Sequence, residues 1–401
     1  MEIEEAVNLI KKAAAPIDEV MAVPLEHAFG YVLASDLVSE QAVPSFPRSA
    51  MDGYAVSSKD ISSASAERPV TLRVAGELLA GDSRDFPYVS GSAVRVMTGA
   101  MVPEGYDSVV KQEDTDYGED EVKIFVSQPP YRNYCHIGEE IKRGETVLEK
   151  GCRIGRSEAG LIASLGLREI KVCRPVKAAV ICTGSELLEA GEKPEDGKIY
   201  NSIRYILCTA IRQEKMEVVT EDTCGDDEDE IIFHIRQALC KADVILTTGG
   251  VSVGKKDLIP GIMDRLGAKR LFGGINIQPG TPTLCSVLDG KVILSLSGNP
   301  YAAMANFDLY FWPLVSELMG SDRFIPRETE AVLSDDYDKL NRMRRLVRAY
   351  ASDGKVYLPA SEHMSSVFGN TVSCNCYIDI PSGVRINPGD KVRIRMMRPG
   401  I

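Results

Sequence analysis

The amino-acid sequence predicts a multidomain protein with a central, doubly wound α/β domain and several β-rich parts. Three short apolar runs, at 178–182, 244–246 and 292–296, each end in a polar, glycine-containing turn and lead into a helical stretch, which is typical of a parallel sheet with crossover helices. Two further regions, 70–127 and 330–401, alternate short β-type runs with turn residues. The 401 residues exceed what one hydrophobic core usually supports, so several domains are expected.

The composition is that of a soluble globular protein, with 44% hydrophobic and 26% charged residues. No run approaches the ~20 apolar residues that span a membrane, and the acidic N-terminus is unlike a targeting peptide. The net charge of −12 argues against nucleic acid as the main partner. The ten cysteines include no CxxC pair, and Cys374 and Cys376 lack nearby histidines for zinc. Reduced cysteines in a cytoplasmic protein are therefore expected.

The N-terminal part predicts a helix followed by a loop rich in ligand-type residues. Apolar positions over 2–15 recur at helical spacing, and 25–37 also looks partly helical, with Gly30 breaking the helix. Two nearby prolines exclude a helix in the next segment, which carries Arg48, Ser49 and Asp52. Two interpretations of this loop stay open: it holds a ligand, or Asp52 merely begins a turn.

Residues 70–127 have the pattern of a small β-rich domain that is distinct from the α/β domain. Within it, Thr98 lies where a predicted strand meets a turn. Further on, His136 and the pair Glu139 and Glu140 are more typical of a solvated surface than of a ligand set. A helix over 156–166 and a strand over 169–173 then lead back to the α/β domain.

Polar side chains follow the three apolar runs at what should be one edge of the sheet. Glu186, Asp257 and Asn299 come after the first, second and third runs. Ligands of parallel α/β sheets bind beyond the carboxyl ends of the strands, where helix N-termini offer free N–H groups. One such turn would be an ordinary connection, but three together favour a ligand site. Helices are predicted at 203–213, 228–241, 261–266 and 301–318.

An acidic run at 226–230 begins one of these helices, where negative charge suits the helix dipole. Capping of the helix explains the run well. Asp226 nevertheless follows a predicted strand, 217–220, and remains a candidate for the site.

The last segment, 330–401, predicts a small β-barrel or sandwich. It holds the densest basic cluster of an acidic chain, at Arg342, Arg344, Arg345 and Arg348. A solvated edge strand and an anion-facing patch are both open interpretations of this cluster.

Six motifs occur in the order of one family. They are PSFPRSAMDGYAV at 44–56, MTGAMVPEG at 97–105, GEEIKRG at 138–144, TGSEL at 183–187, TGGVSVG at 248–254 and SGNP at 297–300. The match covers essentially the whole chain, and the combination of six ordered motifs is highly specific, whereas any one of them alone would be weak. The chain thus resembles the molybdopterin molybdenumtransferase (MoeA) family, which includes the gephyrin E domain.

The resemblance implies an elongated homodimer of four-domain subunits. The expected division is 1–19 plus 175–325 for an α/β domain similar to MoaB and MogA, 20–40 plus 145–174 for a small linking α+β domain, 41–144 for a β-rich domain and 326–401 for a C-terminal β-barrel. It also implies the reaction: adenylylated molybdopterin receives molybdenum from molybdate, with Mg²⁺ present, and AMP is released. The cleft would lie between the α/β domain of one subunit and the β domains of the other. A MogA-like adenylyltransferase and recipient molybdoenzymes would be partners.

The resemblance also places the site on particular residues. Asp52, Glu186, Asp226 and Asp257 are the implied catalytic carboxylates, and Asp226 and Asp257 are the expected metal ligands, since Mg²⁺ binds through one or two carboxylates plus phosphate oxygens. Whether Asp52 and Glu186 relay protons, orient a nucleophile or only accept hydrogen bonds stays open. The implied substrate contacts are Arg48, Ser49, Thr98, Glu140, Thr183, Gly184, Ser185, Gly249, Gly250, Ser252, Gly254, Gly280, Ser297, Gly298, Asn299, Pro300, Ser365 and Ser366.

One segment departs from the family pattern. Three positions that commonly hold lysine carry Gly274, Gln278 and Thr281 here. Charge-assisted hydrogen bonds contribute roughly 1.5–3 kcal/mol each, so losing three without compensation should weaken anion binding severely. Compensation by basic residues close in sequence stays open, the candidates being Lys255, Lys256, Lys269 and Arg270. The alternative is therefore a paralogue that binds the cofactor, or a related nucleotide or oxyanion, as a carrier or accessory factor without turnover. A scaffolding protein is a third interpretation.

Overall fold

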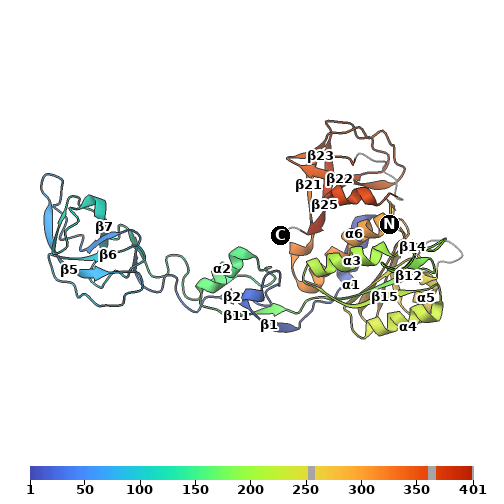
Figure 1. Ribbon diagram of the computed structural model, residues 1–401, viewed down its shortest axis with the longest axis horizontal. Coiled ribbons are helices and arrows are strands. Elements are labelled where there is room, and N and C mark those ends of the chain that lie inside the picture. The colour runs from blue at the N-terminus through green and yellow to red at the C-terminus, as the bar shows by residue number, and fades with distance from the viewer. Residues whose placement is uncertain (252–257, 360–366, 400–401) are drawn as a thin grey trace. The chain divides into compact units, whose positions relative to one another are not determined.

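The computed structural model describes residues 1–251, 258–359 and 367–399, and the chain forms two compact units (Figure 1). The large unit comprises Met1–Ser35, Lys150–Ala159 and Arg168–Ile401, and the small unit comprises Asp36–Glu149 and Gly160–Leu167. The four-domain division expected from the sequence stays a prediction. In the described part of the chain, no helix is long and apolar enough to cross a membrane, and all ten cysteines are free thiols.

A six-stranded mixed sheet forms the centre of the large unit. Its strand order is β15 (Glu217–Cys224), β12 (Lys177–Thr183), β16 (Val244–Thr248), β20 (Lys291–Leu296), β19 (Leu284–Leu288) and β17 (Lys269–Gly273). The first four strands are parallel, and β19 and β17 run antiparallel at one side. The turns that follow β12, β15, β16 and β20 therefore lie along the same edge of the sheet.

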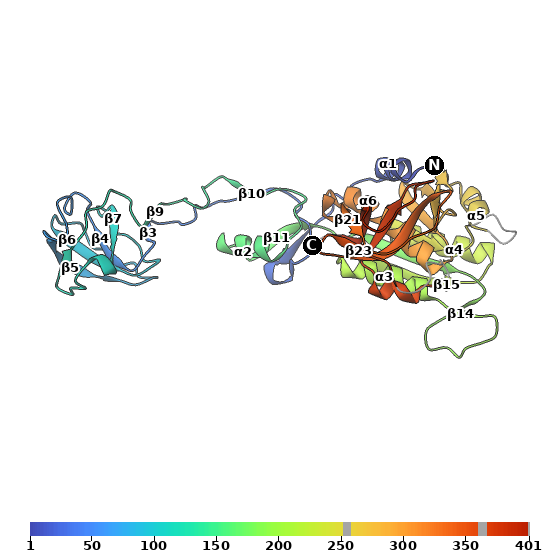
Figure 2. The same ribbon diagram turned by 90° about the horizontal axis from the view of Figure 1, so that it is seen from above.

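Helices cover both faces of this sheet, which confirms the doubly wound prediction (Figures 1 and 2). One face packs against α1 (Ile3–Ala13), α3 (Ser202–Gln213) and α6 (Pro300–Met319), and the other against α4 (Glu228–Leu239) and α5 (Ile259–Leu266). Successive strand residues point to opposite faces. In β12, for example, Val180 belongs to the first core and Ile181 to the second.

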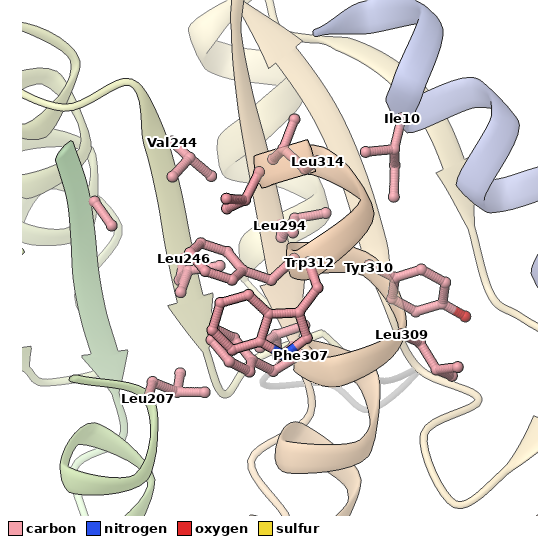
Figure 3. Close-up of a cluster of buried hydrophobic side chains, with 14 of the residues drawn as sticks. Ile10, Leu207, Val244, Leu246, Leu294, Phe307, Leu309, Tyr310, Trp312 and Leu314 are labelled. Carbon is pink, nitrogen blue, oxygen red and sulfur yellow. The ribbon is translucent and has the colours of Figure 1, made fainter. Parts of the chain in front are cut away.

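Helix α6 is the main buried helix of the molecule. Phe307, Tyr310, Trp312 and Leu314 are all at most 2% exposed and lie against Leu246 and Leu294 of the sheet (Figure 3). A helix that is apolar all round belongs in a core. Its position fixes the turn before it, because Asn299 is its N-cap.

The strands β1 (Val20–Pro24) and β11 (Glu169–Cys173) pair antiparallel, and α2 spans Arg156–Ser164. The stretch 25–37, expected to be partly helical and broken at Gly30, forms the short 3-10 helix η1 (Leu25–His27) and no α-helix. Gly30 takes a left-handed backbone angle of +87°, and its N–H bonds to Ile154 O instead of continuing a helix. Long-range pairing therefore overrides the local helical pattern.

The small unit contains a five-stranded sheet, as expected for a β-rich part. Its order is β7 (Ser108–Lys111), β4 (Gly53–Val56), β6 (Ser92–Val96), β5 (Val70–Leu78) and β8 (Glu121–Ile124). Two short pairs accompany it: β3 (Arg48–Ser49) with β9 (Tyr134–Cys135), and β2 (Leu37–Val38) with β10 (Thr146–Leu148). A 3-10 turn, η2, covers Gln112–Asp114.

The C-terminal strands of the large unit close into a barrel. Their order is β22 (Arg344–Ser352), β23 (Lys355–Tyr357), β21 (Pro326–Leu333), β25 (Lys391–Pro399) and β24 (Cys376–Ile380), and a further β22–β24 pairing completes the ring. Because β22 has partners on both sides, it is not the solvated edge strand considered from the sequence. The short strand β18 (Ile277–Gln278) also pairs with β22. The remaining short elements are β13 (Leu187–Leu188), β14 (Ile199–Tyr200), η3 (Asp322–Phe324) and η4 (Gly369–Ser373).

Candidate active site

The turns after β12, β16 and β20 touch one another at the edge of the sheet. Thr183 Oγ1 donates a hydrogen bond to Thr248 O at 3.2 Å, and Gly249 N donates to Leu296 O at 3.2 Å. A Cβ atom on Gly249 would stand only 2.3 Å from Thr183 O. Glycine is therefore required where the second turn crosses the first. The predicted meeting of these turns is present in the structure.

Ser185 and Asp226 join the turns after β12 and β15. Asp226 Oδ2 accepts from Ser185 Oγ at 2.8 Å and from Ser185 N at 3.3 Å, while Asp226 N donates back to Ser185 Oγ at 3.2 Å. Both residues are exposed. The other carboxylate oxygen of Asp226, Oδ1, accepts no hydrogen bond from the described residues, so it can take a ligand.

Glu186 is exposed on the same turn, and its carboxylate lies over Gly184. A Cβ atom on Gly184 would come within 2.8 Å of Glu186 Oε1. Ile199 N donates to Glu186 O at 2.8 Å, and Lys198 Nζ donates to Ser185 O at 2.5 Å. A basic side chain that the sequence had not singled out is thus attached to the acidic turn.

The turn after β20 caps a helix. Asn299 Oδ1 accepts from Ala302 N at 3.0 Å, and Ser297 Oγ accepts from Asn299 N at 3.2 Å. With Pro300 as its first residue, α6 starts directly at the sheet edge. The N-terminus of this long helix favours an anion in front of it. Gly298 is exposed there, so the backbone is accessible.

In the small unit, Asp52 is bound by Thr98. Thr98 N and Thr98 Oγ1 both donate to Asp52 Oδ1 at 2.7 Å, and these bonds hold the pKa of the exposed carboxyl below its usual range. Asp52 is thus ionised at neutral pH. Gly99 N donates to Ser49 O at 2.8 Å, which ties the two loops together.

The other predicted residues of the small unit differ in their surroundings. Ser49 is 1% exposed, and its hydroxyl donates to Met51 O at 2.5 Å, so it shapes the loop before Asp52. Arg48 is half-buried on β3 and forms no ion pair with the described residues. Glu140 is exposed, and its backbone N–H bonds to Val43 O; no described contact joins its carboxylate to Asp52.

The segment that departs from the family pattern leads into a narrow pocket. Gln278 is paired in parallel register with Arg345 of β22, and the pocket is lined by Gln278, Pro279, Tyr301, Arg345, Leu346, Val347 and Arg348. Arg348 is 1% exposed, with its guanidinium 4.2 Å from the centre of the Tyr301 ring. Two arginines therefore lie beside a segment from which lysines are missing.

Gly280 in this segment is fixed from behind by α6. Asn306, which is fully buried, donates from Nδ2 to Gly280 O at 2.9 Å. Thr281 Oγ1 donates to Ile277 O at 2.5 Å, so its hydroxyl also serves the turn. Gly274 and Gln278 are exposed.

Part of the predicted site lies outside the described residues: Ser252, Gly254, Asp257, Ser365 and Ser366, and so do the candidate lysines Lys255 and Lys256. Among the residues that are described, no group of three or more His, Cys, Asp or Glu side chains is arranged to hold a metal ion. Asp226, with one free oxygen, is the described member of the predicted metal pair. Nothing in the sequence pattern pointed to Lys198. Arg345 and Arg348 were recognised as part of a dense basic cluster, but the sequence did not predict that they lie beside Gln278.

Comparison with protein-family models matches three parts of the chain. Residues 1–166 match the MoeA N-terminal region (domain I and II), 179–317 match a probable molybdopterin binding domain, and 330–395 match the MoeA C-terminal region (domain IV). The three matches follow in order along the chain.

Comparison with curated proteins and solved structures gives matches over nearly the full length. The molybdopterin molybdenumtransferases of Staphylococcus epidermidis and Staphylococcus aureus are each 34% identical over 386 residues, which is 96% of this chain and 92% of theirs. The crystal structure of the molybdopterin biosynthesis moeA protein from Pyrococcus horikoshii superimposes with a TM-score of 0.87 at 27% identity, over 99% of both chains.

Proposed function

Because the chain belongs to the molybdopterin molybdenumtransferase (MoeA) family, we propose that it inserts molybdenum from molybdate into adenylylated molybdopterin and releases AMP. The observation that carries this proposal is the full-length match to relatives of that name, at 34% identity over 96% of the chain. The acidic, glycine-rich edge of the sheet supports it, because such an edge suits a pyrophosphate-bearing substrate.

The pyrophosphate of the substrate would lie along the turns after β12, β16 and β20. The N-terminus of α6 and the accessible backbone at Gly298 and Gly250 provide N–H donors for phosphate oxygens. Ser185 holds Asp226 in place through its hydroxyl and its backbone N–H. The carboxylate of Asp226 is thus held by Ser185 through one oxygen, and the other oxygen would take the ligand.

Magnesium fits this arrangement as an ion bound jointly with the substrate. Mg²⁺ commonly uses one or two carboxylates and takes its other ligands from phosphates and water. Asp226, and Asp257 outside the described residues, would hold the ion, which would neutralise phosphate charge during P–O cleavage.

Asp52 would serve as a permanently ionised carboxylate. Its lowered pKa makes it a poor proton donor near neutral pH, whereas it can accept hydrogen bonds or orient an attacking group. Thr98 holds one oxygen, so the other remains for the substrate. For Glu186, on the turn after β12, we propose the role of a hydrogen-bond acceptor.

Arg345, which is half-buried and paired in register with Gln278, would offset part of the charge of the missing lysines. Arg348, by contrast, is only 1% exposed and lies against the Tyr301 ring. Both border the pocket that also contains Gln278. Arginine offers a planar, always charged set of donors that matches an oxyanion such as molybdate. The carrier or accessory paralogue is not favoured, because curated relatives of the same extent are molybdenumtransferases.

The experiment is an in vitro assay with the purified full chain, adenylylated molybdopterin and Mg²⁺, with AMP release followed with and without molybdate. Molybdate-dependent release is expected. Tight binding of the adenylylated pterin without AMP release would instead support the accessory role.

We also propose that the working form is a homodimer, as the resemblance implies. Sedimentation equilibrium at micromolar concentration should give twice the chain mass of 43.8 kDa. A monomer at that concentration would contradict this part of the proposal.

A further inference from the structure

Lys198 and the next residue, Ile199, both form hydrogen bonds to the turn after β12, which carries Ser185 and Glu186. The Lys198 ammonium donates to Ser185 O at 2.5 Å. The next residue, Ile199, donates from its backbone N–H to Glu186 O at 2.8 Å and pairs with Leu187 between β14 and β13. The position of the ammonium is therefore set relative to the turn that carries Ser185 and Glu186.

The ammonium of Lys198 forms no ion pair with any described residue, although the surroundings are acidic. Basic side chains on nearby helices are paired: Arg204 with Glu189 at 2.5 Å, and Arg265 with Asp229 at 2.8 Å. Lys198 instead uses one of its three N–H donors on a neutral carbonyl. Two donors and the full positive charge remain, and the side chain is exposed.

We propose that Lys198 binds a phosphate group of the adenylylated substrate at the sheet edge. The inference rests on the proposed function and adds a cation to a chain that carries Gly274, Gln278 and Thr281 where the family commonly has lysine. A phosphate over the turns after β12 and β15 approaches two carboxylates, Glu186 and Asp226. An ammonium on the same turn offsets that repulsion and donates to the phosphate oxygens.

The competing role is purely structural. Lys198 could serve only to hold the 189–200 loop on the turn through its bond to Ser185 O. The two roles respond differently to substitution, because glutamine can keep the hydrogen bond to the carbonyl but has no charge. Arginine keeps the charge. The pair of variants therefore separates a phosphate cation from a structural tether.

The test measures AMP affinity by calorimetry with the full chain and its variants, at low and at physiological ionic strength. Lys198→Gln should weaken AMP binding roughly 10- to 100-fold, the loss expected for one charge-assisted hydrogen bond. Lys198→Arg should stay within about 3-fold of wild type. Lys193→Gln, on the same exposed loop, is the matched control and should bind as wild type does.

The ionic-strength dependence provides a second readout. Lys198→Gln should reduce the loss of AMP affinity with added salt, since one cation fewer faces the phosphate. Wild-type affinity in Lys198→Gln, or no AMP binding by the wild type, would overturn the inference. If the wild type inserts molybdenum and Lys198→Gln binds AMP as tightly as the wild type does, only the role of Lys198 is refuted. If Lys198→Gln binds AMP more weakly but the wild type does not insert molybdenum, only the proposed reaction is refuted.

Discussion

Asp226 and Asp227 are neighbours with different roles. Asp226 is held by Ser185 at the sheet edge, whereas Asp227 is the N-cap of α4 and accepts from Glu230 N at 2.9 Å. The sequence could not assign these roles, because both aspartates belong to one acidic run. The hydrogen bonds in the structure separate the site residue from the helix cap.

This difference gives a matched pair of variants. Asp226→Asn should reduce molybdate-dependent AMP release at least 100-fold and leave the free energy of unfolding nearly unchanged. Asp227→Ala should lower that free energy by about 1 kcal/mol through loss of the cap, with activity retained. Turnover assays and urea denaturation of both variants provide the measurement. Full activity in Asp226→Asn would remove this carboxylate from the mechanism.

The Asp52–Thr98 pair makes a prediction about pH. Thr98→Val removes the hydroxyl donor and keeps the backbone N–H, so the pKa of Asp52 should rise toward its ordinary value. The acid limb of kcat/KM should then move to higher pH, because the ionised form is lost earlier as pH falls. The control is Thr115→Val in the same unit. An unshifted acid limb in Thr98→Val would contradict the proposed role of the ionised carboxylate.

Sequence reasoning at this scale identified residues but not the partners of their side chains. Ser49 was expected to contact substrate, yet its hydroxyl is used by Met51 O, and Asn299 Oδ1 is used by the first turn of α6. Any substrate contact they make would use other atoms. Motif spacing does not tell an exposed hydroxyl from one that holds its own loop.

At the scale of elements, the turn around Gly280 depends on α6. Gly280 has a backbone angle φ of +102°, and a Cβ atom there would lie 2.4 Å from Asn306 Oδ1. Gly274 has a φ of +75°, but nothing lies within 4 Å of its Cβ position. Both glycines have a positive φ angle, which favours glycine, but only Gly280 lacks room for a Cβ atom.

Gly280→Ala should therefore lower the free energy of unfolding by about 2 kcal/mol or more, and Gly274→Ala by about 1 kcal/mol. Because Gly280 lies two residues from Gln278, Gly280→Ala should also raise the KM for molybdate. Equal losses of stability in the two variants would show that the contact with Asn306 is relieved at little cost.

An ion network around the buried Asp379 joins the barrel to α1, whose residue Glu4 is exposed. Asp379, with 2% of its side chain exposed, accepts from Arg344 Nη2 at 2.6 Å and from Arg395 Nε at 2.8 Å, and Arg344 also pairs with Glu4. Burial by itself would raise the pKa of Asp379, but the two arginines outweigh it and the net pKa is lowered.

The sign of the pH dependence follows from the lowered pKa. The stability that this carboxylate contributes is complete above its unfolded-state pKa of about 3.9 and is lost as pH falls through the lower folded-state value. Asp379→Asn should cost about 3 kcal/mol at pH 7, because two arginines lose a buried partner. Urea denaturation should show the same difference in the free energy of unfolding between wild type and Asp379→Asn at pH 5, and a smaller difference near pH 3. A difference that disappears between pH 7 and pH 5 would contradict this assignment.

The sequence predicted most elements because their apolar periodicity was strong. The helix over 300–319 and the parallel strands of the sheet were recognisable from local pattern. In the stretch 25–37, long-range pairing sets the structure beyond Gly30, because the backbone there bonds to residues 151–154 and 171–173. For the same reason, pairing of β18 with β22 could not be read from the sequence, although it brings Arg345 to Gln278.

At the scale of the whole molecule, the order of six motifs carried the family assignment, and family models matched at 1–166, 179–317 and 330–395 confirm it. Length and composition alone predict only a globular protein of several domains. The substituted positions, Gly274, Gln278 and Thr281, left the activity open. The structure places Arg345 in register with Gln278, and whether this arginine offsets the missing lysines is part of the proposed function.

The most direct test of the proposed reaction is its stoichiometry. Adenylylated molybdopterin, molybdate and Mg²⁺ are incubated with the full chain, and molybdenum bound to the pterin product is measured alongside AMP. One molybdenum per AMP is expected, with neither formed in excess. AMP released without molybdenum in the pterin would show a hydrolase in place of an insertase and contradict the proposed function.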